Sequence, residues 1–140
     1  MKTPLLLVLP LLLLGQAARA QAFEVRFHDF EHTCGPTLAG SFSMPSTLTL
    51  TLRGGLANEP CFWILGLDKT RLPIPVYGCE MYVVPLLVTT TVADAGGAGV
   101  LELRVPILAE TRFFAQAASF RIAPNRLFAS HGLEVEVRAR

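Results

Sequence analysis

The sequence predicts an all-β protein, a single small antiparallel β-sandwich that follows a cleaved amino-terminal signal peptide. The first twenty residues have the pattern of a secretory leader, and the remainder is a series of short apolar segments separated by glycine and proline. Several of these segments alternate between apolar and polar residues, which is the period of a half-buried strand. We therefore expect a signal peptide at 1–20 and one β-sandwich domain at 21–140.

The leader begins with the positively charged Lys2 and continues through an almost wholly apolar run from 5 to 14. Ala18-Arg19-Ala20 then supplies the two small residues that a signal peptidase recognises, so we expect cleavage after Ala20. The apolar run is too short to span a bilayer, which requires ~20 residues. The mature protein is therefore expected to be secreted, either extracellular or periplasmic, with no membrane attachment after cleavage.

Alternation and apolar runs mark the clearest strands. In 47–52 every leucine falls on one face and every threonine on the other. The same period of two occurs in 23–27, 100–105 and 133–137. The mostly apolar run 61–67 is typical of a strand buried on both faces.

Further elements are expected in the middle of the chain. Residues 81–84 and 86–92 are apolar or β-branched and are separated by Pro85, which favours two short strands. The segment 94–99 contains three glycines and is expected to form a turn or hairpin loop.

One segment, 107–118, fits either a helix or a strand. It is rich in alanine and follows Pro106, and proline favours the first position of a helix. We expect a short turn through Glu110 and then a strand from Arg112.

The charge of the mature chain argues against two classes of partner. Cleavage removes Lys2 and Arg19, so 12 basic residues become 10 against 11 acidic ones, a net charge of 10 − 11 = −1. A near-neutral domain with dispersed basic residues lacks the electrostatic footprint of a protein that binds nucleic acid or an anionic membrane. The partner itself stays unknown from the sequence; an extracellular protein or a polysaccharide is compatible with it.

Three cysteines remain after cleavage: Cys34, Cys61 and Cys79. In an exported protein two of them are expected to pair, and the residues by themselves leave all three pairings open. Their spacing lacks the close pairs of a structural zinc site, and no cofactor is expected.

Four short motifs follow one another along the mature chain: Gly78-Cys79-Glu80-Met81 with Pro85, Asp94 and Gly97 before Leu103-Arg104-Val105-Pro106, Phe113-Phe114-Ala115-Gln116-Ala117, and Asn125 with Ser130-His131-Gly132-Leu133. In this order they resemble a small exported β-domain that recurs in the secreted proteins of planctomycetes and related bacteria. The resemblance covers roughly residues 34–137 and implies a β-sandwich and export. The family carries no established activity, so the resemblance implies no catalytic residues.

The resemblance also implies a disulfide pairing. Two recurrent cysteines of the family match Cys34 and Cys79, which favours Cys34–Cys79 over Cys61–Cys79 and makes Cys61 the extra cysteine. The chain departs from the family pattern at three places. His131 stands where asparagine is usual, Phe114 where tyrosine is usual, and Glu110 or a neighbour where glycine is common.

Gln116 and the larger aromatic residues are the candidates for ligand binding. The amide of Gln116 lies in an apolar segment and is expected to bond the backbone of a neighbouring loop, with ligand recognition as the alternative. A carbohydrate site would use Trp63, Tyr77 and Tyr82. Trp63 lies inside an apolar run and is expected in the core, whereas Tyr77 precedes Gly78 and is expected to be more exposed.

Two residues near the carboxyl end are expected in turns. Gly132 is expected where the backbone needs a positive φ. Asn125, which follows Pro124, suits the same kind of turn.

The densest group of titratable residues is His28-Asp29-Phe30-Glu31-His32. Two imidazoles and two carboxylates can bind Zn²⁺ or act as acid and base. In an extended strand His28 and His32 share a face, but their Cα atoms lie ~13 Å apart, too far for joint ligation. The alternative is a polar edge strand whose charges discourage pairing with another sheet.

Three functions are compatible with the sequence. A secreted structural or interaction module without catalytic activity fits the sandwich pattern best. A carbohydrate- or ligand-binding module would need exposed aromatic residues grouped with polar ones. A secreted metal-dependent hydrolase would need His28, His32, His131 and a carboxylate to converge. Apolar strand edges that face solvent would favour self-association instead.

Overall fold

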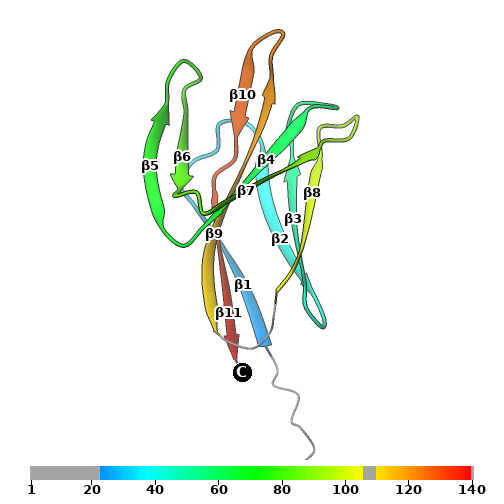
Figure 1. The fold of residues 1–140 in the computed structure, drawn as a ribbon, viewed down its shortest axis with the longest axis vertical. Coiled ribbons are helices and arrows are strands. Elements are labelled where there is room, and N and C mark those ends of the chain that lie inside the picture. Colours follow the sequence, from blue (N-terminus) through cyan, green and yellow to red (C-terminus); the bar gives the residue numbers. More distant parts are fainter. Residues whose placement is uncertain (1–22, 106–109, 140) are drawn as a thin grey trace, which may run out of the picture.

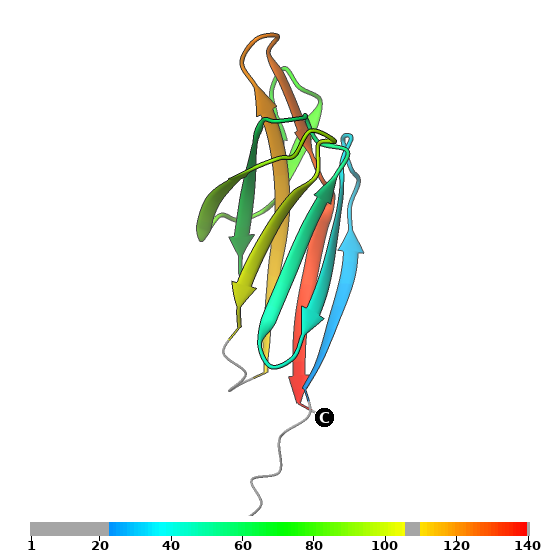
Figure 2. The same cartoon turned by 90° about the vertical axis from the view of Figure 1, so that its right-hand side faces the viewer.

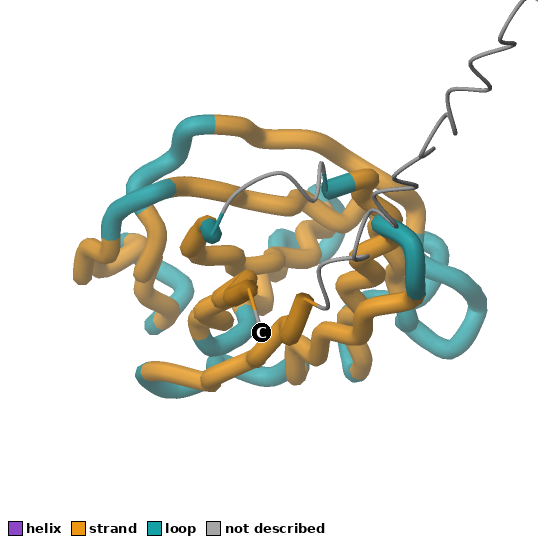
Figure 3. Tube along the Cα trace, turned by 90° about the horizontal axis from the view of Figure 1, so that it is seen from below, coloured by secondary structure: helices purple, strands orange, loops and turns teal. Residues whose placement is uncertain are grey.

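The computed structural model describes residues 23–105 and 110–139, and every regular element in these residues is a β-strand (Figures 1 and 3). The described residues contain no helix long and apolar enough to cross a membrane. The leader expected at 1–20 lies outside the described residues. The strands are β1 (Phe23–Phe30), β2 (Thr37–Ser43), β3 (Thr47–Arg53), β4 (Pro60–Gly66), β5 (Lys69–Ile74), β6 (Cys79–Val83), β7 (Leu87–Val92), β8 (Gly99–Arg104), β9 (Thr111–Arg121), β10 (Arg126–Ala129) and β11 (Gly132–Ala139).

The strands form two main sheets and one hairpin. The larger sheet, called sheet A, has the order β1-β11-β9-β4-β7, with β10 also paired to β9. The smaller one, sheet B, has the order β2-β3-β8, and β5 pairs with β6 in a separate hairpin. All of these pairings are antiparallel. Figure 2 shows the two sheets facing each other along the long axis, so the expected antiparallel β-sandwich is confirmed.

The core lies between the sheets and follows from the alternation in 47–52. The three leucines of that segment are fully buried, whereas its threonines are only half-buried on the other face. The leucines pack against the inner face of sheet A, where Trp63, Ala117 and Val135 are fully buried. Because a core leucine contributes roughly 2–5 kcal/mol relative to alanine, this one strand supplies a large share of the stability.

The central strand β9 explains why an alanine-rich segment forms a strand rather than a helix. Ala115 and Ala117 face sheet B, whereas Ala118 faces the β5–β6 hairpin, which covers part of the outer face of sheet A. Both faces of β9 are therefore closely packed, and small side chains allow the layers to approach. The strand begins at Thr111, one residue before the expected Arg112, and the expected turn through Glu110 falls largely on 106–109, outside the described residues.

A disulfide attaches the hairpin to the rest of the domain. Cys79 begins β6 and is bonded to Cys34 in the loop after β1, with Cα atoms 5.5 Å apart. The favoured pairing is confirmed, and Cys61 is the free, buried cysteine. Burial raises the pKa of the Cys61 thiol, so this side chain behaves as a small core residue rather than a nucleophile.

Several local expectations differ from the structure. Strands β2, β5 and β10 were not expected, because their residues lack a clear alternation of apolar and polar side chains. The run at 61–67 forms β4, but its burial alternates, and Phe62 and Ile64 on the outer face are only half-buried. The hairpin covers part of that face and leaves the rest to solvent.

The expectation for Gly132 is wrong. Gly132 begins β11 and is not among the residues with positive φ, which include Gly35, Gly54 and Gly78. A Cβ atom at Gly132 would lie 2.2 Å from Cζ of Phe30. The glycine is needed for the close approach of an aromatic ring across the β1–β11 pair, and not for a turn.

Candidate functional site

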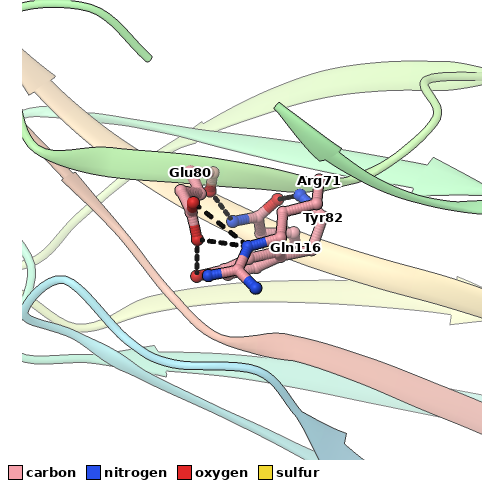
Figure 4. Close-up of polar contacts among 4 residues, drawn as sticks. All are labelled: Arg71, Glu80, Tyr82 and Gln116. Carbon is pink, nitrogen blue, oxygen red and sulfur yellow. Dashed lines mark hydrogen bonds and ion pairs between the residues drawn. The ribbon is translucent and has the colours of Figure 1, made fainter. Parts of the chain in front are cut away.

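The amide of Gln116 is the centre of a polar network beneath the β5–β6 hairpin (Figure 4). Its Oε1 accepts a hydrogen bond from the Tyr82 backbone N–H at 2.8 Å. Its Nε2 donates to the Glu80 carbonyl at 2.8 Å and to the Ser130 carbonyl at 2.9 Å. Gln116 is 1 % exposed, and its amide therefore bonds protein backbone on two sides rather than a ligand.

The position of Gln116 follows from a break in the sheet. Strand β10 pairs with residues 118–121 of β9, and β11 pairs with residues 111–115. Gln116 and Ala117 therefore lie where β10 ends and β11 begins. At this junction Ser130 bonds Ala117 through both its backbone N–H and its hydroxyl. The Gln116 amide satisfies the neighbouring backbone groups that no strand partner reaches.

The carboxylate of Glu80 extends this network to the surface. It accepts hydrogen bonds from the Arg71 guanidinium at 3.2 Å and from the Tyr82 hydroxyl at 3.0 Å. Hydrogen bonding by Arg71, and next by Tyr82, lowers the pKa of the Glu80 carboxyl. Burial, and next the Glu80 carboxylate, raises the pKa of the Tyr82 phenol. The three side chains hold β5 against β6, which is a structural role.

The aromatic candidates do not form a common surface. Trp63 is 0 % exposed, as expected, and its indole donates to the Thr91 hydroxyl at 2.8 Å. Tyr82 is 3 % exposed. Tyr77 is half-buried: its hydroxyl donates to Asn125 Oδ1 at 2.6 Å, and its ring contacts Phe120 edge-on. Asn125 lies in the turn between β9 and β10.

The histidines are also separated from one another. His28 is exposed on β1, the edge strand of sheet A, and its Cα partner is Glu134 on β11. The chain leaves β1 at Glu31, where φ is 61°, and His32 instead lines a cavity of about 280 Å³ with Glu80 and Tyr82. Nowhere in the described residues do three or more His, Cys, Asp or Glu side chains gather as a metal site would require.

His131, the third histidine, is buried. Its Nε2 lies 3.2 Å from Asp29 Oδ1, but the angles do not meet those of a hydrogen bond, and this nitrogen has no hydrogen-bond partner among the described residues. The hydroxyl of the preceding Ser130 donates to the His131 carbonyl at 2.7 Å rather than to an imidazole. These neighbours therefore lack the geometry of a nucleophile and its base.

The described surface contains an apolar groove of about 570 Å³. It lies between the ends of β4 and β7 in sheet A and the end of β8 in sheet B. Apart from Gly66, Thr111 and Arg104, the residues that line it are hydrophobic. The lining residues are Leu65, Gly66, Leu67, Leu86, Leu87, Leu103, Arg104, Val105, Thr111 and Phe113.

Strand β7 contributes Leu87 to the lining of this groove and is also the open edge of sheet A. Three apolar side chains of this strand are exposed to solvent: Leu87 is 52 % exposed, Val88 53 % and Val92 70 %. Leu86, just before the strand, is 73 % exposed. The sequence interpretation placed a strand here but missed its exposure. The signal was present, because residues 81–93 contain no charged side chain.

Comparison with known proteins adds no relative. No family model matches the chain, and neither a curated protein nor a solved structure matches it. The resemblance to an exported planctomycete-type domain therefore stays a prediction.

Replacing Gln116 with leucine should destabilise the protein by about 3 kcal/mol, because buried backbone groups of Tyr82, Glu80 and Ser130 would lose their partner. Urea denaturation measures the change. Gln116→Glu should also destabilise, since an oxygen would face the two carbonyls. If the free energy of unfolding of Gln116→Leu lay within about 0.5 kcal/mol of the wild type, the network would not be needed for stability.

The Glu80 carboxyl should make stability sensitive to acid. Its pKa is lower in the folded chain than the ordinary value of 4.5. The ionised carboxyl therefore adds to the free energy of unfolding above pH 4.5, and this contribution is lost as the pH falls through the folded pKa. When urea denaturation is measured at neutral and at acidic pH, the free energy of unfolding should fall less for Glu80→Gln than for the wild type. Glu102→Gln, at an exposed position on β8, is the control and should follow the wild type.

Proposed function

We propose that the mature protein is an exported β-sandwich interaction module without catalytic activity, and that its contact surface is the apolar groove with the neighbouring β7 edge. The observation that carries this proposal is the exposure of leucine at a concave surface: Leu67 is 59 % and Leu87 52 % exposed at the rim of the groove. Exposed apolar surface next to a hollow is typical of a site that binds another molecule.

The chemistry of the groove indicates the class of partner. Leucine, valine and phenylalanine side chains dominate its lining, and Arg104 is its single charged residue among those described. Such a surface gains free energy by burying apolar side chains, at about 25 cal/mol per Å² removed from water. We infer that the groove binds apolar side chains of another exported polypeptide rather than a sugar.

The polar clusters support a module rather than an enzyme. Glu80, Arg71 and Tyr82 bond one another, and Gln116 bonds backbone groups. Catalysis would need polar side chains of this kind to be available to a substrate, whereas the contacts of these residues hold the hairpin in place. The carbohydrate-binding alternative has less support, because Trp63 and Tyr82 are buried and only Tyr77 is partly accessible.

Export rests on two independent observations. The leader at 1–20 has the features of a signal peptide. The Cys34–Cys79 disulfide is the kind of bond that forms and persists outside the reducing cytosol.

A neutral apolar dye tests the groove. Nile red titrated against the folded protein should bind with increased fluorescence, and Leu67→Lys should weaken that binding about tenfold by placing a charge in the rim. Ile122→Lys is the matched control, because Ile122 is 81 % exposed but lies in the turn after β9. Equal binding by the Leu67 variant and the wild type would contradict the proposal.

Intact mass of the exported protein tests the leader and the disulfide together. We expect a chain that begins at Gln21 and takes up one alkyl group without reductant, on Cys61 after denaturation, and three after reduction. A mass that retains residues 1–20, or three alkyl groups without reductant, would contradict export by this route.

A further inference from the structure

We propose that two copies of this protein associate through β7, whose open edges pair antiparallel so that sheet A continues from one copy into the other. The inference rests on the proposed function and names the partner of the module as a second copy of the same chain. Four observations lead to it: the free edge, its lack of charge, its self-complementary sequence and its exposed apolar side chains.

The first observation is that β7 has a strand partner on one side only. In the described residues it pairs with β4 from Leu87 to Val92 and ends the order of sheet A. From Leu87 to Val92 the register of the pair contains no shift, so this part of the edge is regular. A regular, unpaired edge presents a row of backbone donors and acceptors to any strand of matching sequence.

The second observation is that this edge lacks the charges that protect the other edges. The opposite end of sheet A is β1, which carries Glu24, Arg26 and Asp29, and the β8 edge of sheet B carries Glu102 and Arg104. Edge β2 is uncharged too, but its solvent-exposed residues are small, namely Thr37, Ala39, Ser41 and Ser43. Only β7 combines an uncharged edge with large exposed apolar residues among these four strands.

The third observation is that the sequence of β7 can pair with itself. A two-fold axis perpendicular to the sheet and centred on Thr89 places Leu87 opposite Thr91, Val88 opposite Thr90, and Thr89 opposite its own copy. Every cross-strand pair is then apolar or contains threonine, and no like charges meet. β-Branched residues and threonine pairs favour such a ladder.

The fourth observation concerns which side chains the pairing would cover. Residues 88, 90 and 92 lie on one face of β7, opposite to the face that Thr91 turns toward Trp63 in the core. On that face Val88 is 53 % and Val92 70 % exposed, and the proposed pairing brings this face of one copy beside the same face of the other. A symmetric interface buries the same patch twice, so both copies gain equally.

Sedimentation velocity of the exported protein over a range of concentrations tests the association. The wild type should sediment as a dimer at high concentration and dissociate on dilution. Val92→Lys should weaken the association about tenfold or more, because each copy would place an ammonium group in the paired edge. Ile122→Lys adds the same charge at a site away from β7 and should behave as the wild type.

Cysteine substitution tests the register. With the axis at Thr89, Thr89→Cys brings two cysteines opposite each other and should yield a disulfide-linked dimer under mild oxidation. Val92→Cys should not, since its own copy would lie several residues away along the strand. Cross-linking by Val92→Cys alone would overturn the register, and a wild type that stays monomeric at every concentration would overturn the proposal.

These outcomes separate the inference from the proposed function. A monomeric wild type whose groove still binds Nile red, with the loss expected for Leu67→Lys, would contradict self-association and leave the interaction module in place. A dimer that Val92→Lys dissociates, in a protein that binds no dye, would support the β7 interface and contradict the role of the groove.

Discussion

The side-chain amide of Gln116 is the contact on which the arrangement of layers depends. It joins the backbone of β6 to the junction between β10 and β11, and it does so from the strand at the centre of sheet A. Without it, backbone groups in the interior would lose their partners at the point where the sheet ladder is interrupted. The Cys34–Cys79 disulfide and the Arg71–Glu80–Tyr82 cluster hold the same hairpin, so one layer is secured by covalent, ionic and hydrogen-bonded contacts together.

The two sides of the sandwich differ in how they meet solvent. On one side β1 carries charged residues, and the hairpin covers part of the outer face of sheet A. On the other side lies an apolar groove, and β7 has no charged residue. The polar groups hold the fold, whereas the apolar surface is the part of the molecule that we propose for association. This division is the physical basis of the proposed interaction module.

The polar residues show that residue type by itself does not identify a site, because the backbone geometry decides which side chains meet. Histidines and carboxylates near the end of β1 suggested a metal or an acid–base pair, yet His28 lies on the sheet edge and His32 beyond the turn at Glu31. Ser130 and His131 are adjacent, but the serine hydroxyl bonds backbone groups. In each case the local backbone direction decides which side chains can meet, and that direction is not encoded in residue type alone.

Period and composition by themselves determined the fold class, the core leucines of β3 and the burial of Trp63, because alternation assigns side chains to one face whatever the neighbouring strand is. They also placed β4, β8 and β11 within a few residues. The pairing of strands, the two buried faces of β9 and the open edge at β7 depended on contacts between distant segments. Gln116 shows the difference: its type indicated a buried amide with backbone partners, but only the tertiary structure brought Glu80, Tyr82 and Ser130 to it. Likewise the uncharged run at 81–93 is visible in the sequence, whereas its place at a free edge follows from which strands pair, a choice made by packing over the whole chain.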